Sequence, residues 1–490
     1  MGSFSIWHWL IVGSVLLAIF GGGWTMRTAP SSAGKSYMYS VTKNISAAMH
    51  LGRIAPQTVI DRLEDRHKAR LPELGMDTTR LLSEAKVAKK RNLVFAFAFL
   101  VPAYGFLSGA FQYGLVEQGS LSPVAYASYF VMPLALATLL GFAKTLLVNR
   151  HIRKNLMPCA DKADDLRGFN AVIFGGFFPF AGYGIDVEGW SFTIDTLKPK
   201  TEGAEPQPIT QTDFLNFVFG ALARNITEGC IEDKLFVNGL GIKNNKQFLA
   251  EPRGMPITRI DPADVAARLG FPEQTVRHYR LISIPLSFGH MHLTFFLRST
   301  MLGSNLFIES HGYLLLPLRP EFTEIVDIPA KRGVWYHSRL LLYDLVVSPF
   351  SWLLSLWHLF AAAQRALQHL LRAVFGHPED KIKSRTETYN YGNTSSLRES
   401  WASGSFQAYY EMQDREMAMK TCEHIIINAM VDYLDARGIA TDDIKERRTQ
   451  IFNSGVMVSG GTVNAQQMAV GTGANVKSKI SKAVSSAKKR

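Results

Sequence analysis

The sequence predicts a mixed α/β membrane protein, in which three transmembrane helices hold an α+β domain with an antiparallel meander and a helical C-terminal unit. The first supporting observation is a set of three uncharged apolar runs, residues 6–20, 93–116 and 122–143. The second and third runs have the roughly 20 residues that a helix needs to cross a hydrocarbon core of about 30 Å. The second observation is the change, beyond residue 165, to short apolar runs typical of strands.

The distribution of Lys and Arg around these runs predicts their orientation. The segment 21–92 holds 13 Lys and Arg residues, the connection 117–121 holds none, and Arg150, Arg153 and Lys154 follow the third run. Because positively charged loops stay on the cytoplasmic side, we expect the N-terminus and residues 117–121 outside the cell. The protein is therefore predicted to be a multi-pass protein of a cell inner membrane with a cytoplasmic C-terminus.

The net charge of +12 fits the same location. Six of the last 14 residues, 477–490, are basic and none is acidic. Such a tail attracts anionic lipid, whereas nucleic acid is not an expected partner because the basic residues are not interleaved with aromatic ones. The three cysteines lie far apart in sequence, without the spacing of a metal site, which fits a reducing compartment.

The first apolar run is short and carries a recognisable sequence. Its first 12 residues read MGSFSIWHWLIV, with His8 in the first turn, and the run ends at Phe20 and Gly21. This segment resembles the anchor of TatA-type twin-arginine translocase subunits, which implies a short helix with its N-terminus outside. The chain then departs from that family, because Gly-Gly-Trp and Pro30 stand where its amphipathic helix begins. We therefore expect a borrowed anchor over residues 1–22, with an accessory role in protein export as an alternative.

Residues 23–92 are predicted to form a cytoplasmic helical stalk, and residues 93–150 a transmembrane hairpin. Apolar residues over 56–92 follow helical spacing, with a break at Pro72 and Gly75. Lys144 lies inside the third run, at its inner end, where a long side chain reaches the headgroups.

Residues 165–330 are predicted to form the cytoplasmic α/β domain. Glycines and Pro179 interrupt the apolar segment 169–185, which favours a buried strand with turns over a re-entrant membrane segment. The pattern further predicts a strand around Phe192, a helix over 214–226 and a helix that starts at Asp261 and Pro262. Three strand-like runs follow with short turns, so an antiparallel meander is expected, over 279–286, 290–298 and 305–316.

Residues 340–376 are predicted to form an amphipathic helix. As a fourth span, this segment would place the basic tail outside, against the Lys and Arg rule. It is therefore expected to lie in the inner interface, or alternatively to pack on the soluble domain, with Trp352, Leu356 and Phe360 toward the lipid.

The C-terminal part is predicted to contain a helical unit over 380–450, with a long helix over 406–434 and a charged helix over 442–451. A glycine-rich segment, 451–476, then carries short alternating runs that cannot form a stable sheet alone. We expect self-association there, through Val456, Val458, Val463 and Val470, or a local stack on the edge of the domain. The segment is weakly similar to the short motifs of bacterial amyloid signalling.

Catalytic motifs are not evident. Two segments near the phosphate-loop pattern, 29–36 and 471–478, each lack a required glycine. A zinc site is the alternative that the histidines leave open, because His290 and His292 would share a strand face that His278 and His311 could join. The competing interpretation is a wet sheet face with scattered histidines.

The cytoplasmic region from residue 169 resembles uncharacterised bacterial membrane proteins, on the phrases 184–190, 276–279, 451–456 and 469–471. That resemblance implies a fold and no activity. The predicted function is a non-enzymatic scaffold or sensor that self-assembles at the bilayer, as a homo-oligomer with an unidentified protein partner and without a cofactor. The alternatives are a membrane-tethered metal-binding or hydrolytic enzyme, an accessory of protein export, and a membrane effector of a bacterial defence system.

Overall fold

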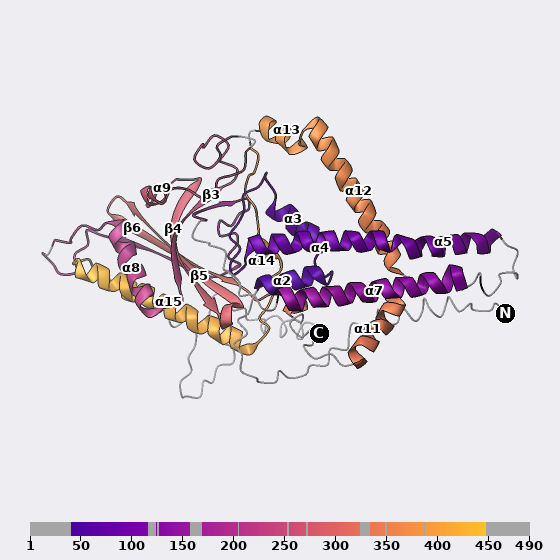
Figure 1. Ribbon diagram of the computed structural model, residues 1–490. Helices are drawn as coiled ribbons and strands as arrows, with labels where there is room; N and C mark the ends of the chain where they lie inside the picture. The colour runs from indigo at the N-terminus through magenta and orange to yellow at the C-terminus, as the bar shows by residue number, and fades with distance from the viewer. Residues whose placement is uncertain are drawn as a thin grey trace, which may run out of the picture.

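The structure is a computed structural model that describes residues 41–115, 124, 127–156, 169–203, 205–251, 254–270, 273–323, 334–347, 350–386 and 388–446. In this part of the chain, long helices project from one side of a sheet, while two helices cover a face of that sheet (Figure 1). The first apolar run, the glycine-rich segment and the basic tail lie outside the described residues.

Two helical segments of the described chain are long and apolar enough to cross a membrane, Thr78–Gln112 and Ala127–Leu156. Only 33% and 28% of their most apolar windows are buried, whereas the core helix of a soluble protein is mostly buried. Large side chains such as Tyr104 and Phe111 are exposed along them. The predictions of membrane-length helices at 93–116 and 122–143 are confirmed. The elements are α4 (Thr78–Ala98), α5 (Leu100–Leu115), η2 (Ala127–Val131), α7 (Met132–His151) and η3 (Ile152–Leu156).

The predicted stalk forms a small bundle at the base of these helices. Helices α2 (Val41–His50) and α3 (Pro56–Leu63) pack against α4, and Ile45, Met49 and Leu81 share one core with the end of α7. The predicted break in the stalk is confirmed, because a loop over 64–77 separates α3 from α4. Gly75 in that loop has φ +69°, a conformation that favours glycine, and a Cβ there would lie 2.8 Å from Nε2 of His292.

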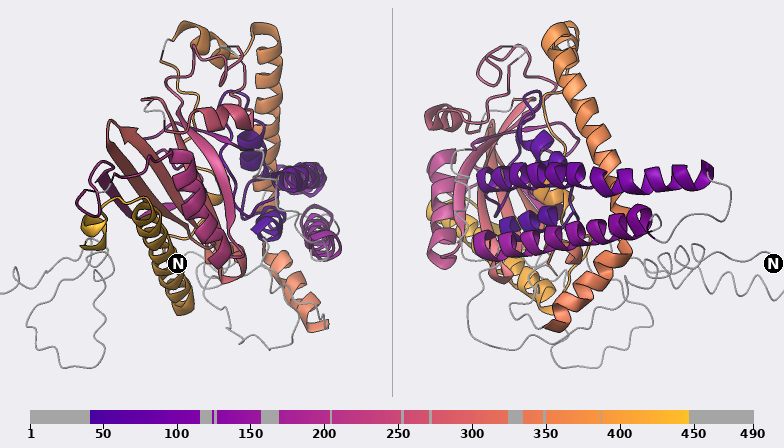
Figure 2. Two further views of the ribbon diagram at one scale, coloured as in Figure 1. Left: turned by 90° about the vertical axis from the view of Figure 1, so that its left-hand side faces the viewer. Right: turned by 45° about the vertical axis from the view of Figure 1, so that its right-hand side comes forward.

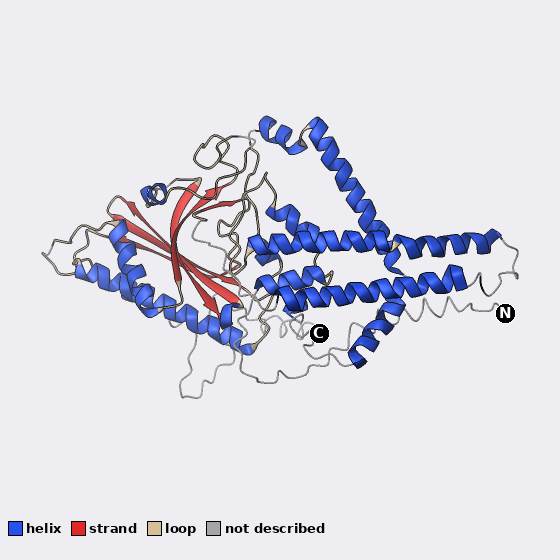
Figure 3. Cartoon of the chain, in the orientation of Figure 1, coloured by secondary structure: helices blue, strands red, loops and turns tan. Residues whose placement is uncertain are grey.

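The sheet has six strands in the order β1-β3-β4-β5-β6-β2 (Figure 3). The pair β1 and β3 is parallel and every other pair is antiparallel. The predicted meander is confirmed as β4, β5 and β6. The strands are β1 (Ala171–Phe174), β2 (Ile185–Asp195), β3 (Cys230–Asn238), β4 (Val276–Leu286), β5 (Met291–Leu302) and β6 (Asn305–Leu315).

One face of the sheet is covered by α8 (Gln211–Asn225) and α15 (Tyr409–Ala436). Phe214 of α8 and Ile427 of α15 share a core with Leu293 and Ile308 of the sheet. The predicted helices at 214–226 and 406–434 are thus present, and the long C-terminal helix completes the core of the α/β domain. The shorter helices are α9 (Pro262–Ala267), which Asp261 caps, η5 (Ser287–Gly289), α10 (Pro320–Thr323), α13 (Pro378–Arg385) and α14 (Leu397–Ser400).

The other face of the sheet is covered by the segment 175–184 and by the loop 64–77, which we call the stalk loop. Phe180 lies at the centre of an aromatic cluster, with its ring centroid 4.2 Å from that of Phe296 and 5.0 Å from that of Phe236. Leu71 and Leu74 of the stalk loop belong to the same core. Residues 169–185 therefore form a strand and turns within the domain, and the re-entrant alternative is wrong.

Two further helices lie against the membrane-length helices (Figure 2). Helix α11 (Val334–Val347) packs beside α7, and α12 (Ser351–Phe375) crosses α4 and α5. Asp344, on α11, is buried. The side chains of Leu356 and Phe360 on α12 are 41% and 61% exposed.

Candidate functional site

The stalk loop is attached to the sheet domain through a buried carboxylate. Glu73 is 8% exposed, and its two carboxylate oxygens accept hydrogen bonds from the backbone N–H groups of Leu397 and Arg398, each at 2.8 Å. Burial raises the pKa of Glu73 to about 7, although both N–H donors favour the ionised form. The first turn of α14 is thereby bound to the stalk.

The same turn is also bound to the sheet domain. Glu399 accepts hydrogen bonds from the N–H groups of Gly182 and Gly184, both at 2.8 Å. The buried guanidinium of Arg398 donates to the carbonyl oxygen of Leu316 at 2.7 Å. We call the contact of residues 69–77 with residues 393–399 the joint.

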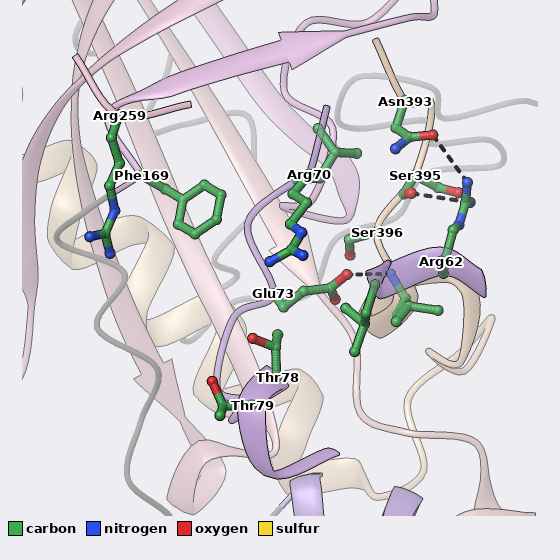
Figure 4. A pocket seen from close by; sticks show the side chains of 13 residues that line it. Arg62, Arg70, Glu73, Thr78, Thr79, Phe169, Arg259, Asn393, Ser395 and Ser396 are labelled. Atoms are coloured by element: carbon green, nitrogen blue, oxygen red, sulfur yellow. Dashed lines mark hydrogen bonds between the residues drawn. The ribbon is translucent and has the colours of Figure 1, made fainter. Parts of the chain in front are cut away.

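Beside the joint lies a cavity of about 250 Å³ with a rim of arginines (Figure 4). Arg70 and Arg259 both line this cavity, and the ring of Phe169 lies between their guanidinium groups in Figure 4. Neither guanidinium forms a hydrogen bond or an ion pair with any residue that the structure describes. Arg62, by contrast, donates to Oδ1 of Asn393 at 3.1 Å and to the carbonyl oxygen of Ser395.

The chemistry of this cavity suits an anion. Its lining adds the hydroxyl groups of Thr78, Thr79 and Ser395 to the arginines, and Glu73 is the one acid among the described lining residues. Guanidinium groups bind oxyanions with charge-assisted hydrogen bonds. The described lining contains neither histidine, lysine nor cysteine, and its one carboxylate, that of Glu73, already accepts hydrogen bonds from the N–H groups of Leu397 and Arg398. The arrangement therefore supports binding.

A second polar cluster joins α2, α4 and α7. The Nε2 atoms of His50 and His151 each lie 2.8 Å from the same carboxylate oxygen of Glu84, and the potential ligand atoms of the three residues lie within 4.8 Å of one another. Two imidazoles and a carboxylate are a donor set that zinc accepts.

The hydrogen bonds of His50 oppose a metal ion in this cluster. Arg91 lies 2.8 Å from Nδ1 of His50, and a guanidinium can only donate. Burial lowers the pKa of His50, so the ring is neutral and carries its proton on Nε2, where it donates to Glu84. A metal would need this nitrogen deprotonated. We therefore interpret the cluster as a hydrogen-bond network that links helices α2, α4 and α7.

Replacing Glu84 with Leu is expected to lower the unfolding temperature of the detergent-solubilised protein, because the N–H groups of buried His50 and half-buried His151 lose their acceptor. Such losses cost about 1–3 kcal/mol for each group. Glu84→Gln is the matched control, since it keeps an acceptor oxygen and should lose less than half as much. Stoichiometric zinc in the wild-type protein that is absent from the Glu84→Leu variant would contradict the hydrogen-bond network and establish a metal site.

The four histidines predicted to share a strand face are separated in the structure. His278 lies on the face covered by α8 and α15 and donates a hydrogen bond from Nε2 to Oδ1 of Asp233 at 2.9 Å, whereas His292 and His311 lie on the opposite face. His290 precedes β5, because residues 287–289 form the turn η5. His292 pairs with Leu315, and His311 pairs with Phe296. His292 and His311 are therefore also separated along the strands. Convergence on one zinc ion is not supported by this placement.

The other predicted functional residues are partly described. Leu356 and Phe360 are exposed on α12, and Lys144 is half-buried on α7. The side chain of Trp352 and the valines predicted to self-associate, Val456, Val458, Val463 and Val470, lie outside the described residues.

Comparison with known families places this geometry in context. The family described as AbeC-like domain matches residues 189–465, which is more than half of the chain. The chain belongs to the AbeC-like domain family. The AbeC-like domain supplies Arg259 and Ser395 to the cavity, while Arg70 and Glu73 come from the stalk, outside the matched residues.

A short segment is similar to a different kind of protein. The chain is 77% identical over 22 residues to a Sec-independent protein translocase protein TatA of Methylocella silvestris, and 73% identical over 22 residues to that of Beijerinckia indica. Each match covers 4% of this chain and 27% of the relative, so the chain spans about a quarter of the length of these relatives. This supports the resemblance of the N-terminal segment to a TatA anchor. No solved structure matches the chain.

Proposed function

We propose that this chain is a membrane-bound component of bacterial defence, in which the AbeC-like domain is a non-enzymatic sensor and the membrane-length helices carry its response. Membership in the AbeC-like domain family supports the defence role. The two long apolar helices and the TatA-like segment support membrane association.

The joint is the observation that carries this proposal. Glu73 binds the stalk loop to the first turn of α14, within the AbeC-like domain. Five residues later the chain enters α4, which is the first part of the first membrane-length segment. A displacement of the turn therefore moves the end of that helix, since few residues separate the two.

The proposed arrangement places the N-terminus and residues 117–121 outside and the AbeC-like domain in the cytoplasm, as the Lys and Arg distribution predicts. Helix α12 lies along the inner surface with Leu356 and Phe360 toward the lipid. Assembly into homo-oligomers, through the short first helix and the segment 451–476, brings several copies of the helices together.

Deleting the gene from its native genomic context is expected to raise the efficiency of plating of at least one phage in a panel by tenfold or more. Wild-type protein should restore resistance, and so should a chimera whose residues 1–22 are replaced by an unrelated helix with its N-terminus outside. Resistance that depends on the native 1–22 segment would favour an export accessory instead. Unchanged plating across the panel would contradict the defence proposal.

A further inference from the structure

The lining of the cavity at the joint carries an excess of positive charge, with three arginines and one glutamate. Arg268 pairs with Glu273 at 2.7 Å, and Arg298 pairs with Glu309 at 3.0 Å. Arg70 and Arg259 instead line one cavity without a counter-ion among the described residues. An anion that enters this cavity meets positive charge from both the stalk and the AbeC-like domain.

The number of donors indicates which anion fits. The arginines present several N–H groups, and four hydroxyl groups line the same cavity. A carboxylate offers only two oxygens, whereas a terminal phosphate offers three and carries more charge. We propose that this cavity binds the phosphate group of a small soluble ligand, held by Arg70 from the stalk and Arg259 from the AbeC-like domain.

The distance from the membrane favours a soluble ligand over a lipid headgroup. Thr78 lines the cavity, and the apolar run begins at residue 93, roughly 15 residues or about 22 Å farther along α4. The headgroup layer is only about 5–8 Å thick on each side of a bilayer. The cavity therefore lies beyond the layer in which lipid phosphates reside when α4 runs along the membrane normal.

The bound phosphate connects two parts of the chain. Arg70 and Thr78 belong to the stalk, while Arg259 and Ser395 belong to the AbeC-like domain. Occupancy strengthens the joint, because each side contributes donors to one ligand. A regulatory effect of this ligand rests on the proposed function, whereas binding itself does not.

The test is a calorimetric titration of the full-length protein in phosphatidylcholine nanodiscs with inorganic pyrophosphate. Saturable binding is expected, and Arg70→Gln and Arg259→Gln should each weaken it at least tenfold, which corresponds to about 1.4 kcal/mol. Arg224→Gln, at an exposed position of helix α8, is the matched control and should bind as the wild type does. Both cavity arginines are exposed, so the variants should keep the wild-type unfolding temperature.

Three outcomes would overturn the inference. The first is the absence of saturable binding, and the second is wild-type affinity in both cavity variants. The third is that nanodiscs containing phosphatidylglycerol raise the unfolding temperature through the same two arginines while pyrophosphate has no effect, because the phosphate source would then be a lipid. Binding without phage resistance in cells would overturn the defence proposal alone.

Discussion

Replacing Glu73 with Leu is expected to destabilise the joint by about 3 kcal/mol or more. The substitution removes the carboxyl group that accepts two hydrogen bonds and leaves the N–H groups of Leu397 and Arg398 buried without their acceptor, at a cost of about 1–3 kcal/mol for each. Hydrogen–deuterium exchange should rise at residues 64–77 and 396–400. The apparent unfolding temperature should fall by about 6 °C or more.

Glu64→Leu is the matched control for this experiment. Glu64 lies in the same loop and pairs with Lys86 at 2.7 Å, but both side chains are about half exposed. Exposed pairs contribute about 0–1 kcal/mol. Exchange at residues 396–400 that stays at the wild-type level in Glu73→Leu would show that the joint does not depend on this carboxylate.

Replacing Phe180 with Ala is expected to lower the free energy of unfolding of the sheet domain by about 3–5 kcal/mol. The ring is 4% exposed, and its centroid lies 5.1 Å from that of Tyr279 and 4.9 Å from that of Tyr313, in addition to the contacts with Phe236 and Phe296. Removal leaves a void at the centre of this cluster. Thermal unfolding followed by near-ultraviolet circular dichroism measures the loss.

Phe177 provides an internal comparison, because it lies three residues away and is 90% exposed. Phe177→Ala should change the stability by no more than about 0.5 kcal/mol. Equal effects of the two substitutions would mean that the segment 175–184 does not close the sheet as described.

Local patterns in the sequence predict much of this fold. The membrane-length helices follow from uninterrupted apolar runs, and the meander follows from three strand-like runs joined by short turns. Asp261 followed by proline predicts the start of α9, where the Asp261 side chain accepts a hydrogen bond from the N–H of Ala263. Each of these signals is contained within a few tens of residues.

Contacts between distant segments could not be predicted in this way. Glu73 and Leu397 are separated by 324 positions, and the cavity gathers residues from the stalk, from the segment before β1 and from the AbeC-like domain. The hydrogen-bond network of His50, Glu84 and His151 likewise joins three helices, and no sequence spacing connects its residues. Such pairs leave no periodic signal, because their proximity depends on how the chain packs.

The prediction that the four histidines share one strand face was wrong for a more local reason. The turn between β4 and β5 sets a register in which even-numbered residues of β4 pair with odd-numbered residues of β5, such as Ile282 with Phe295. His278 and His292 therefore point to opposite faces. A turn longer or shorter by one residue would have reversed this result, and the sequence did not specify its length.

The near-continuous helical segment Thr78–Gln112 has a mechanical consequence. Its 35 residues span about 52 Å, and Glu73 is bound only a few residues before its first turn. This segment acts as a lever arm whose near end lies at the sheet domain. A tilt of about 5° at that end moves the far end sideways by roughly 4–5 Å, about the spacing of one helical turn. A small change of tilt near the stalk thus becomes a lateral displacement of several ångströms at the far end of the segment.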